Sequence, residues 1–116
     1  MDPSIQLDIL DLVIEDSFAL SELVARVRQA HPSLSRRDAT ERAKETLIAM
    51  LRSDLIRVTR LEAPGDEEQA LDYSAAMTAF DDELNWLELR HWRPHARVVA
   101  TDEGQKVFYR RRSRQE

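Results

Sequence analysis

The side chains best suited to metal binding in this chain are its histidines. His91 and His95 lie four residues apart, a spacing that brings two imidazoles to one face of a helix, where they could bind Zn²⁺. However, Pro94 breaks any helix between them, and no third ligand is evident, because His31 is distant in sequence. The chain has no cysteine, which excludes a thiolate site. The sequence therefore predicts no metal site.

Nucleophilic catalysis requires a positioned serine or threonine beside a histidine and a carboxylate. These residue types are present, but no segment resembles a nucleophile elbow. The two glycines, Gly65 and Gly104, cannot form a glycine-rich phosphate loop. The acidic runs 66–68 and 81–83 are typical of helix starts and solvated faces rather than of an acid–base pair. We therefore predict a protein that is not an enzyme, has no cofactor and works by binding.

A mixed-charge helix face is the first candidate binding surface. In the segment 36–53, one apolar residue stands among charged ones on the side facing away from the predicted core. One interpretation is a solvated face with a stray isoleucine, or a core that is wider than the pattern suggests. The other is a contact face for a protein partner, with these residues: Arg37, Glu41, Lys44, Ile48 and Arg52.

The same segment carries the candidates for nucleic-acid binding. The basic and hydroxyl side chains that could contact duplex DNA here are Arg36, Arg37, Thr40, Lys44 and Arg52. Lys106 and the run 110–114 add further positive charge near the end of the chain. Glu41 and Glu45 are interleaved with these bases, and they would face phosphates at an energetic cost. The bases are also typical of helix caps, local ion pairs and a solubilising tail.

A helix followed by a strand must position these side chains. Ser35 and Asp38 have the form of a capping box, which predicts a helix from 36 to 53. Ser53-Asp54 ends this helix, and the alternation of 55–61 predicts a half-buried strand. The core face of the helix is predicted to carry Ala39, Ala43, Thr46, Leu47 and Met50.

Two shorter helices are predicted before this segment, at 4–15 and at 21–30, the second capped by Ser21. After the segment, a return strand at 96–100 is expected to pair with 55–61. The order of elements is therefore three helices followed by a strand pair.

An insert of about 34 residues, 62–95, separates the two predicted strands. Within it, Asp66–Leu71 has acidic residues in its first turn and predicts a short helix. Ser74 is expected to cap a further helix, and Leu87–His91 alternates in the manner of a short strand. The apolar repeat of the second insert helix consists of Ala76, Phe80 and Leu84.

The segment 101–110 fits either a hairpin strand or a final helix. We favour the helix, because Thr101 followed by two acidic residues is good N-terminal helix chemistry. The basic tail 110–116 is expected to fray.

Composition indicates one domain spanning residues 1–116. No apolar run approaches the roughly 20 residues of a membrane helix. The first residues have no basic region followed by an apolar stretch, and cysteine is absent, so we expect a cytoplasmic protein that does not contact membrane. Composition does not decide between a monomer and a homodimer.

Charge is segregated along the chain. Residues 1–24 carry six acidic residues and no lysine or arginine, and residues 61–90 carry nine acidic residues against Arg90 alone. Residues 91–116 carry seven bases against three acids. The net charge of −5 disfavours a domain devoted to DNA, although an acidic protein can still present a basic face.

The chain resembles winged-helix proteins and, more narrowly, small uncharacterised bacterial proteins of that fold. The resemblance rests on the order of elements, on Ile9-Leu10-Asp11-Leu12 with Glu15-Asp16 in the first helix, and on Thr101-x-Glu103-Gly104. It implies that the third helix could enter the DNA major groove while a hairpin wing touches the backbone. The insert departs from this pattern, because it is long and acidic where a wing would be short and basic.

We therefore predict an α+β fold, mostly α: a winged-helix-like three-helix core, a two- or three-stranded antiparallel sheet, and a helical insert between the strands. The predicted function is binding of another protein, such as a basic toxin or another basic macromolecule, in the manner of an immunity protein or an adaptor. The alternative is a DNA-binding transcriptional regulator that uses helix 36–53.

Overall fold

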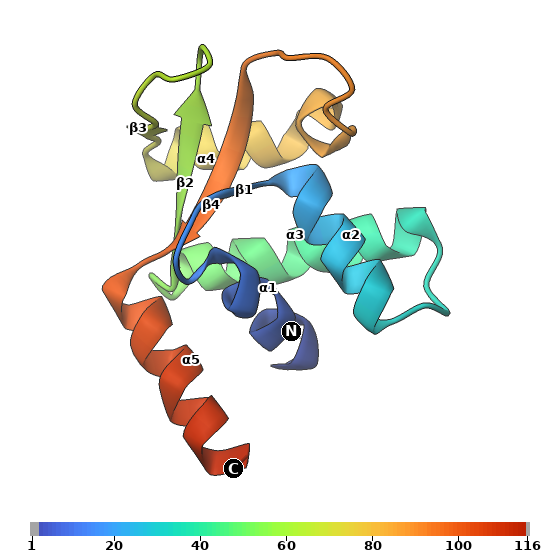
Figure 1. Cartoon of the computed structure of the whole chain (residues 1–116), viewed down its shortest axis with the longest axis vertical. Coiled ribbons are helices and arrows are strands. Elements are labelled where there is room, and N and C mark those ends of the chain that lie inside the picture. Colours follow the sequence, from blue (N-terminus) through green and yellow to red (C-terminus); the bar gives the residue numbers. More distant parts are fainter. Residues whose placement is uncertain (1–2, 116) are drawn as a thin grey trace.

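The structure is a computed structural model that describes residues 3–115 (Figure 1). It has an α+β fold in which helices predominate, as the sequence predicts. The helical elements are α1 (Pro3–Val13), α2 (Leu20–Ala30), α3 (Arg36–Arg52), α4 (Tyr73–Asp81), the 3₁₀ turn η1 (Glu83–Trp86) and α5 (Asp102–Gln115). The strands are β1 (Phe18–Ala19), β2 (Ile56–Leu61), β3 (Gln69–Ala70) and β4 (His95–Ala100).

The strands form one antiparallel sheet in the order β1-β4-β2-β3. Its centre is the predicted pair, β2 with β4, in a register that places Val58 opposite Val98. Both valines are buried, so this side of the sheet faces the helices. The sheet has four strands rather than two or three, because β1 and β3 add two-residue edges. Strands this short leave no alternation in a sequence.

The three-helix core forms as the sequence predicts. α1, α2 and α3 pack on one another, and α1 and α2 also contact β4. The core face of α3 is buried at every predicted position, namely Ala39, Ala43, Thr46, Leu47 and Met50. At the start of the helix, the Ser35 hydroxyl accepts a hydrogen bond from the Asp38 N–H (3.1 Å).

The end of α3 is a Schellman motif that turns the chain into β2. The Leu55 N–H donates to the Met50 carbonyl (2.9 Å), and the Asp54 N–H donates to the Leu51 carbonyl (3.1 Å). This places Asp54 in the left-handed region, with φ of 59°. Glycine is the residue that normally occupies this position, because it has no Cβ to strain.

We expect Asp54→Gly to stabilise the protein by about 0.5–1 kcal/mol, because it removes the Cβ from a left-handed position. Chemical denaturation should show a higher midpoint with an unchanged slope. Asp54→Ala should not raise the midpoint, because it keeps the Cβ. A lower midpoint for the glycine variant would contradict this view of the turn.

Two predicted helix boundaries shift in the structure. α1 ends at Val13 rather than at residue 15. α2 begins at Leu20, and Ser21 is not its cap: the Glu22 carboxylate accepts from the Ala19 N–H (3.1 Å) just before the helix. Ala19 is paired in β1, so the strand edge fixes where the helix can begin.

The insert folds differently from its prediction. Residues 66–71 form no helix but run into β3, because the Glu68 carboxylate accepts from the hydroxyls of Ser17, just before β1, and Thr59, within β2. The Leu71 N–H also donates to the Val58 carbonyl (2.9 Å). α4 is capped by Asp72 rather than Ser74. It ends at Asp81, so Leu84 lies outside it and is exposed. Residues 87–91 form no strand.

The last segment is a helix, as favoured, and not a hairpin strand. Thr101 is the anchor: its N–H donates to the Leu55 carbonyl (3.1 Å) and its hydroxyl accepts from the Gly104 N–H (3.0 Å). Gly104 is buried against the Leu55 carbonyl. Residues 110–116 were predicted to fray, but residues 110–115 continue α5, and Glu116 lies outside the described residues.

Of the described helices, none combines the length and the apolar character needed to cross a membrane.

Candidate protein-binding groove

α4 covers the C-terminal half of the predicted contact face on α3. The Lys44 ammonium pairs with the Asp81 carboxylate (2.7 Å), and Arg52 Nε donates to the Tyr73 hydroxyl (3.0 Å). Ile48 is only partly exposed and packs against the core cluster. The expectation of one open face from Arg37 to Arg52 is therefore wrong for its second half. The wider-core interpretation applies to Ile48.

The N-terminal half of α3 has a different environment, because it forms one wall of a groove of about 430 Å³. The sequence-predicted residues that line this groove are Arg36, Arg37, Thr40 and Glu41. The other wall comes from the insert, with Glu83, Trp86 and Leu87. The structure thus brings four predicted residues together with three that the sequence did not assign to a site.

Two buried side chains, those of Trp86 and Asn85, fix the position of the insert wall of the groove. The Trp86 indole N–H donates to the Phe80 carbonyl (2.8 Å), and the two rings lie 6.4 Å apart at a tilt. The Asn85 amide donates to the Ala79 carbonyl (2.9 Å) and accepts from the Ala96 N–H (3.1 Å). η1 is therefore tied to both α4 and β4, which fixes the wall relative to the sheet.

The outer side of η1 is apolar. Leu84 lies within η1, and Leu87, the residue that follows this turn, lines the groove. These side chains remain 58% and 50% exposed. Trp92, five residues further on, is 40% exposed and meets the His95 ring edge-on at 5.4 Å. Three large apolar side chains are thus half-exposed within nine residues.

Arg93 holds the segment after η1 in a turn. Its guanidinium donates to the carbonyls of Leu84 (2.6 Å), Leu87 (2.7 Å) and Glu88 (3.3 Å). Because the Leu87 and Glu88 carbonyls bond to Arg93, they are not paired with a neighbouring strand, and residues 87–91 form no strand. The same contacts fix the backbone at Leu84 and Leu87.

Each candidate DNA-contacting residue on α3 already has an intramolecular contact. Arg36 pairs with Glu88 (3.9 Å), Arg37 pairs with Glu41 (3.6 Å), and the Thr40 hydroxyl donates to the Arg36 carbonyl (2.8 Å). With the contacts of Lys44 and Arg52, all five are engaged. The other exposed residues on α3 are Asp38, Glu41, Arg42 and Glu45, and three of these four would repel phosphate.

The histidines are placed apart from this groove lining. His95 is buried, with Nδ1 2.9 Å from the Arg93 carbonyl and Nε2 2.9 Å from the Arg97 guanidinium. Because a guanidinium only donates, Nε2 accepts and Nδ1 carries the proton that is donated to Arg93. His91 is exposed. Among residues 3–115, no group of three histidine, aspartate or glutamate side chains could hold a metal ion.

The sequence contained one signal for the missed groove wall. The insert carries both tryptophans of the chain, and Trp86 lines the groove. In the sequence, Leu84 continues the four-residue apolar repeat of Ala76 and Phe80, and it was therefore predicted to lie on the core face of a helix. The helix stop at Asp81 removes Leu84 from that repeat.

Comparison of the chain with family models, curated proteins and solved structures found no match.

Proposed function

We propose that this protein is a non-enzymatic, winged-helix-like module that binds another protein through the groove between the start of α3 and η1. The partner inserts an apolar side chain beside Trp86 and Leu87, and basic residues around that anchor face the acidic insert. The order α1-β1-α2-α3-β2, with β4 returning beside β2, supports the winged-helix-like assignment.

The observation that carries this proposal is the pair of half-exposed leucines, Leu84 and Leu87, on a braced turn beside a groove. Leu84 and Leu87 remain about half exposed, so burial of their apolar surface by a partner would be favourable. Grooves of this kind, with an apolar floor and charged rims, are typical of sites that receive an anchor side chain from a partner.

The charge of the insert indicates a basic partner. Residues 62–95 contain nine of the 22 acidic side chains but only two of the 17 basic ones. The insert therefore accounts for the acidity of the whole chain. Within residues 3–115, the side chains of Asp66, Glu67 and Glu83 are exposed and make no hydrogen bond or ion pair, so they are available to a basic partner. An immunity protein that neutralises a basic toxin, or an adaptor, would use such a surface.

The DNA-binding alternative has less support from this geometry. A regulator would have to exchange the contacts of Lys44 with Asp81 and of Arg36 with Glu88 for phosphate contacts. Binding of a random duplex at low salt, abolished by Lys44→Glu together with Arg52→Glu, would favour the regulator over the proposed module.

Selection from a random peptide library on the immobilised protein tests the groove. We expect enriched peptides to carry an aromatic or aliphatic anchor flanked by lysine or arginine. Leu87→Asp should weaken a selected peptide by about 2 kcal/mol, or roughly thirtyfold, because it puts a charge into the groove.

Arg42→Ala is the matched control for this experiment. It lowers the net charge by the same single unit, but Arg42 is exposed on α3 and does not line the groove. Its affinity for the selected peptide should stay close to that of the wild type. Equal affinity of the wild type and Leu87→Asp would contradict the proposal, as would a selection that yields no consensus.

A further inference from the structure

The C-terminal half of α5 projects past the rest of the protein. In Figure 1 this helix leaves the sheet beside α1 and extends beyond it. Phe108 is buried against the core, whereas Tyr109 is 51% exposed. On the side that faces α1, Arg111 donates a hydrogen bond to the Gln6 side chain (3.1 Å), whereas Tyr109 and Arg110 are exposed, and short helical segments gain most of their stability from packing. The projecting turns would therefore be stabilised by a second surface.

One stripe of this helix is basic. Lys106, Arg110 and Arg114 recur every four residues, which places them along one side of α5. All three side chains are exposed, and among residues 3–115 none of them has an ion-pair or hydrogen-bond partner. Tyr109 lies next to this stripe.

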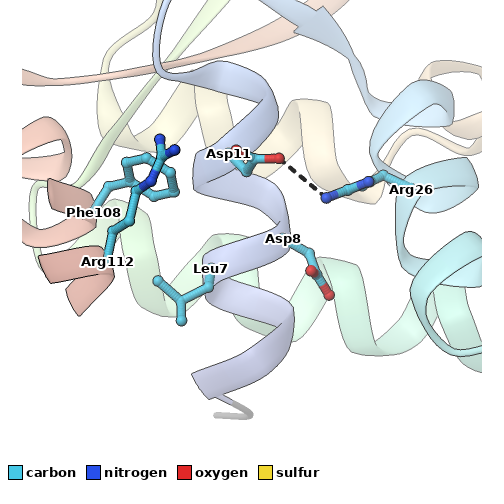
Figure 2. Close-up of a pocket in the computed structure, with 6 residues that line it drawn as sticks. All are labelled: Leu7, Asp8, Asp11, Arg26, Phe108 and Arg112. Carbon is cyan, nitrogen blue, oxygen red and sulfur yellow. Dashed lines mark hydrogen bonds and ion pairs between the residues drawn. The ribbon is translucent and has the colours of Figure 1, made fainter. Parts of the chain in front are cut away.

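The outer side of α1 has the complementary character. Figure 2 shows a hollow around α1, in which Leu7 points toward Phe108 and Arg112 on α5, while Asp8 and Asp11 point toward α2. A second hollow adjoins it and shares Asp11, Phe108 and Arg112. Their volumes are about 280 and 310 Å³. The second is lined by α1 and the chain that follows it, with Leu12, Ile14, Glu15 and Asp16.

The acidic residues of this groove are only partly satisfied within the chain. Asp11 pairs with Arg26 (3.1 Å) and Asp8 lies 3.3 Å from His31, but both ion pairs are accessible to solvent. Glu15 is exposed and makes no side-chain contact among the described residues. The groove thus offers the carboxylates of α1 beside apolar side chains and the two arginines Arg26 and Arg112, while the exposed stripe of α5 offers cations.

We propose that the occupant of this groove is a second copy of the same chain. In a twofold-symmetric dimer, α5 of each protomer lies along the α1 groove of its partner, so the acidic-to-basic contact is made twice. The charge complementarity between the two helices of one chain favours this occupant over an unrelated basic protein. The interface uses none of the residues that line the α3–η1 groove, so it stands independently of the proposed function.

Molecular mass in solution tests this interface. The monomer has a mass of 13.5 kDa, and sedimentation equilibrium at low salt should give about twice that value. Raised salt should weaken the dimer, because exposed charges are screened. Two charge-reversed variants should each be monomeric: Asp11→Lys with Glu15→Lys on α1, and Arg110→Glu with Arg114→Glu on α5.

An equimolar mixture of these two variants is the decisive sample. In a mixed pair, the basic α1 of one protein meets the acidic α5 of the other, and the second contact keeps its native signs. The mixture should therefore regain the dimer mass that both variants lack alone. Circular dichroism checks folding, and Glu15→Lys alone replaces the α1 variant if the double change unfolds it.

A wild-type protein that stays at the monomer mass at low salt would overturn the proposal. So would a mixture that remains monomeric, or variants that dimerise as well as the wild type. Binding of a basic peptide or of duplex DNA at this face by a monomeric wild type would assign the surface to a different occupant and would likewise overturn it.

Discussion

Replacing Gly104 with alanine is expected to destabilise this protein by about 3 kcal/mol, because the added methyl group overlaps a backbone atom. A Cβ at this position would collide with the Leu55 carbonyl, which cannot move away without breaking its hydrogen bond from the Thr101 N–H. The melting temperature should fall by roughly 10 °C or more. Calorimetry of the two proteins measures this difference.

The sign of the stability change in Gly104→Ala shows whether α5 docks against Leu55. Gly104 lies inside a helix, where propensity alone predicts that alanine stabilises by about 1 kcal/mol. Arg42→Ala is the control, because Arg42 is exposed on α3 and its replacement should change stability by no more than about 0.5 kcal/mol. A Gly104→Ala variant at least as stable as the wild type would show that α5 does not dock on Leu55 as described.

Removing the Arg97 side chain is the second large effect that we expect, with a loss of about 2–3 kcal/mol, because it leaves buried polar groups without partners. Arg97 Nε and Nη2 donate to the hydroxyl and the carbonyl of Ser17 (2.9 and 2.7 Å), and Nε lies 3.5 Å from the Glu68 carboxylate. Glu68 in turn accepts from the Ser17 and Thr59 hydroxyls, both at 2.8 Å.

This cluster joins four parts of the sheet: the start of β1, the middle of β2, the approach to β3, and β4. Arg97→Ala should therefore loosen the β1 and β3 edges first, which amide hydrogen exchange along these two strands would show. We expect the loss of stability in Arg97→Ala to be smaller than that for removing one partner of a fully buried ion pair, because the Glu68 side chain is 31% exposed.

Arg57→Ala is the matched control for Arg97→Ala. Arg57 lies on the neighbouring strand and, by alternation, on the same side of the sheet, since Arg57 is opposite Val99 and Thr59 is opposite Arg97. It is exposed and has no contact partner among residues 3–115, so its removal should change stability by less than about 0.5 kcal/mol. Equal losses for the two arginines would contradict a structural role for the cluster.

The elements that the sequence predicted well are those whose stability is local. The α3 cap at Ser35, the buried alanine–leucine face of α3 and the alternation of β2 all depend on residues within a few positions of one another. The final helix was likewise predicted from Thr101 and its acidic neighbours. The structure adds that the Thr101 N–H donates to the Leu55 carbonyl, which fixes the start of α5 at the turn between α3 and β2.

The insert could not be predicted, because contacts distant in sequence decide its fold. Glu68 is drawn to Ser17, 51 positions away, and this contact pulls residues 66–71 into a strand edge instead of a helix. Asp81 pairs with Lys44, which closes α4 over the second half of the face that the α3 periodicity left exposed. Helical periodicity identifies the side that avoids the core, but it does not reveal which segment covers that side.

The most direct test of the groove is amide chemical-shift mapping of the labelled protein titrated with a selected basic peptide. The proposal predicts that the largest changes cluster at Thr40, Glu83 and Leu87, with Arg42 and Glu45 on the open side of α3 unaffected. Changes centred on Arg42 and Glu45, with none at Leu87, would contradict the claim that η1 and the start of α3 together form the binding surface.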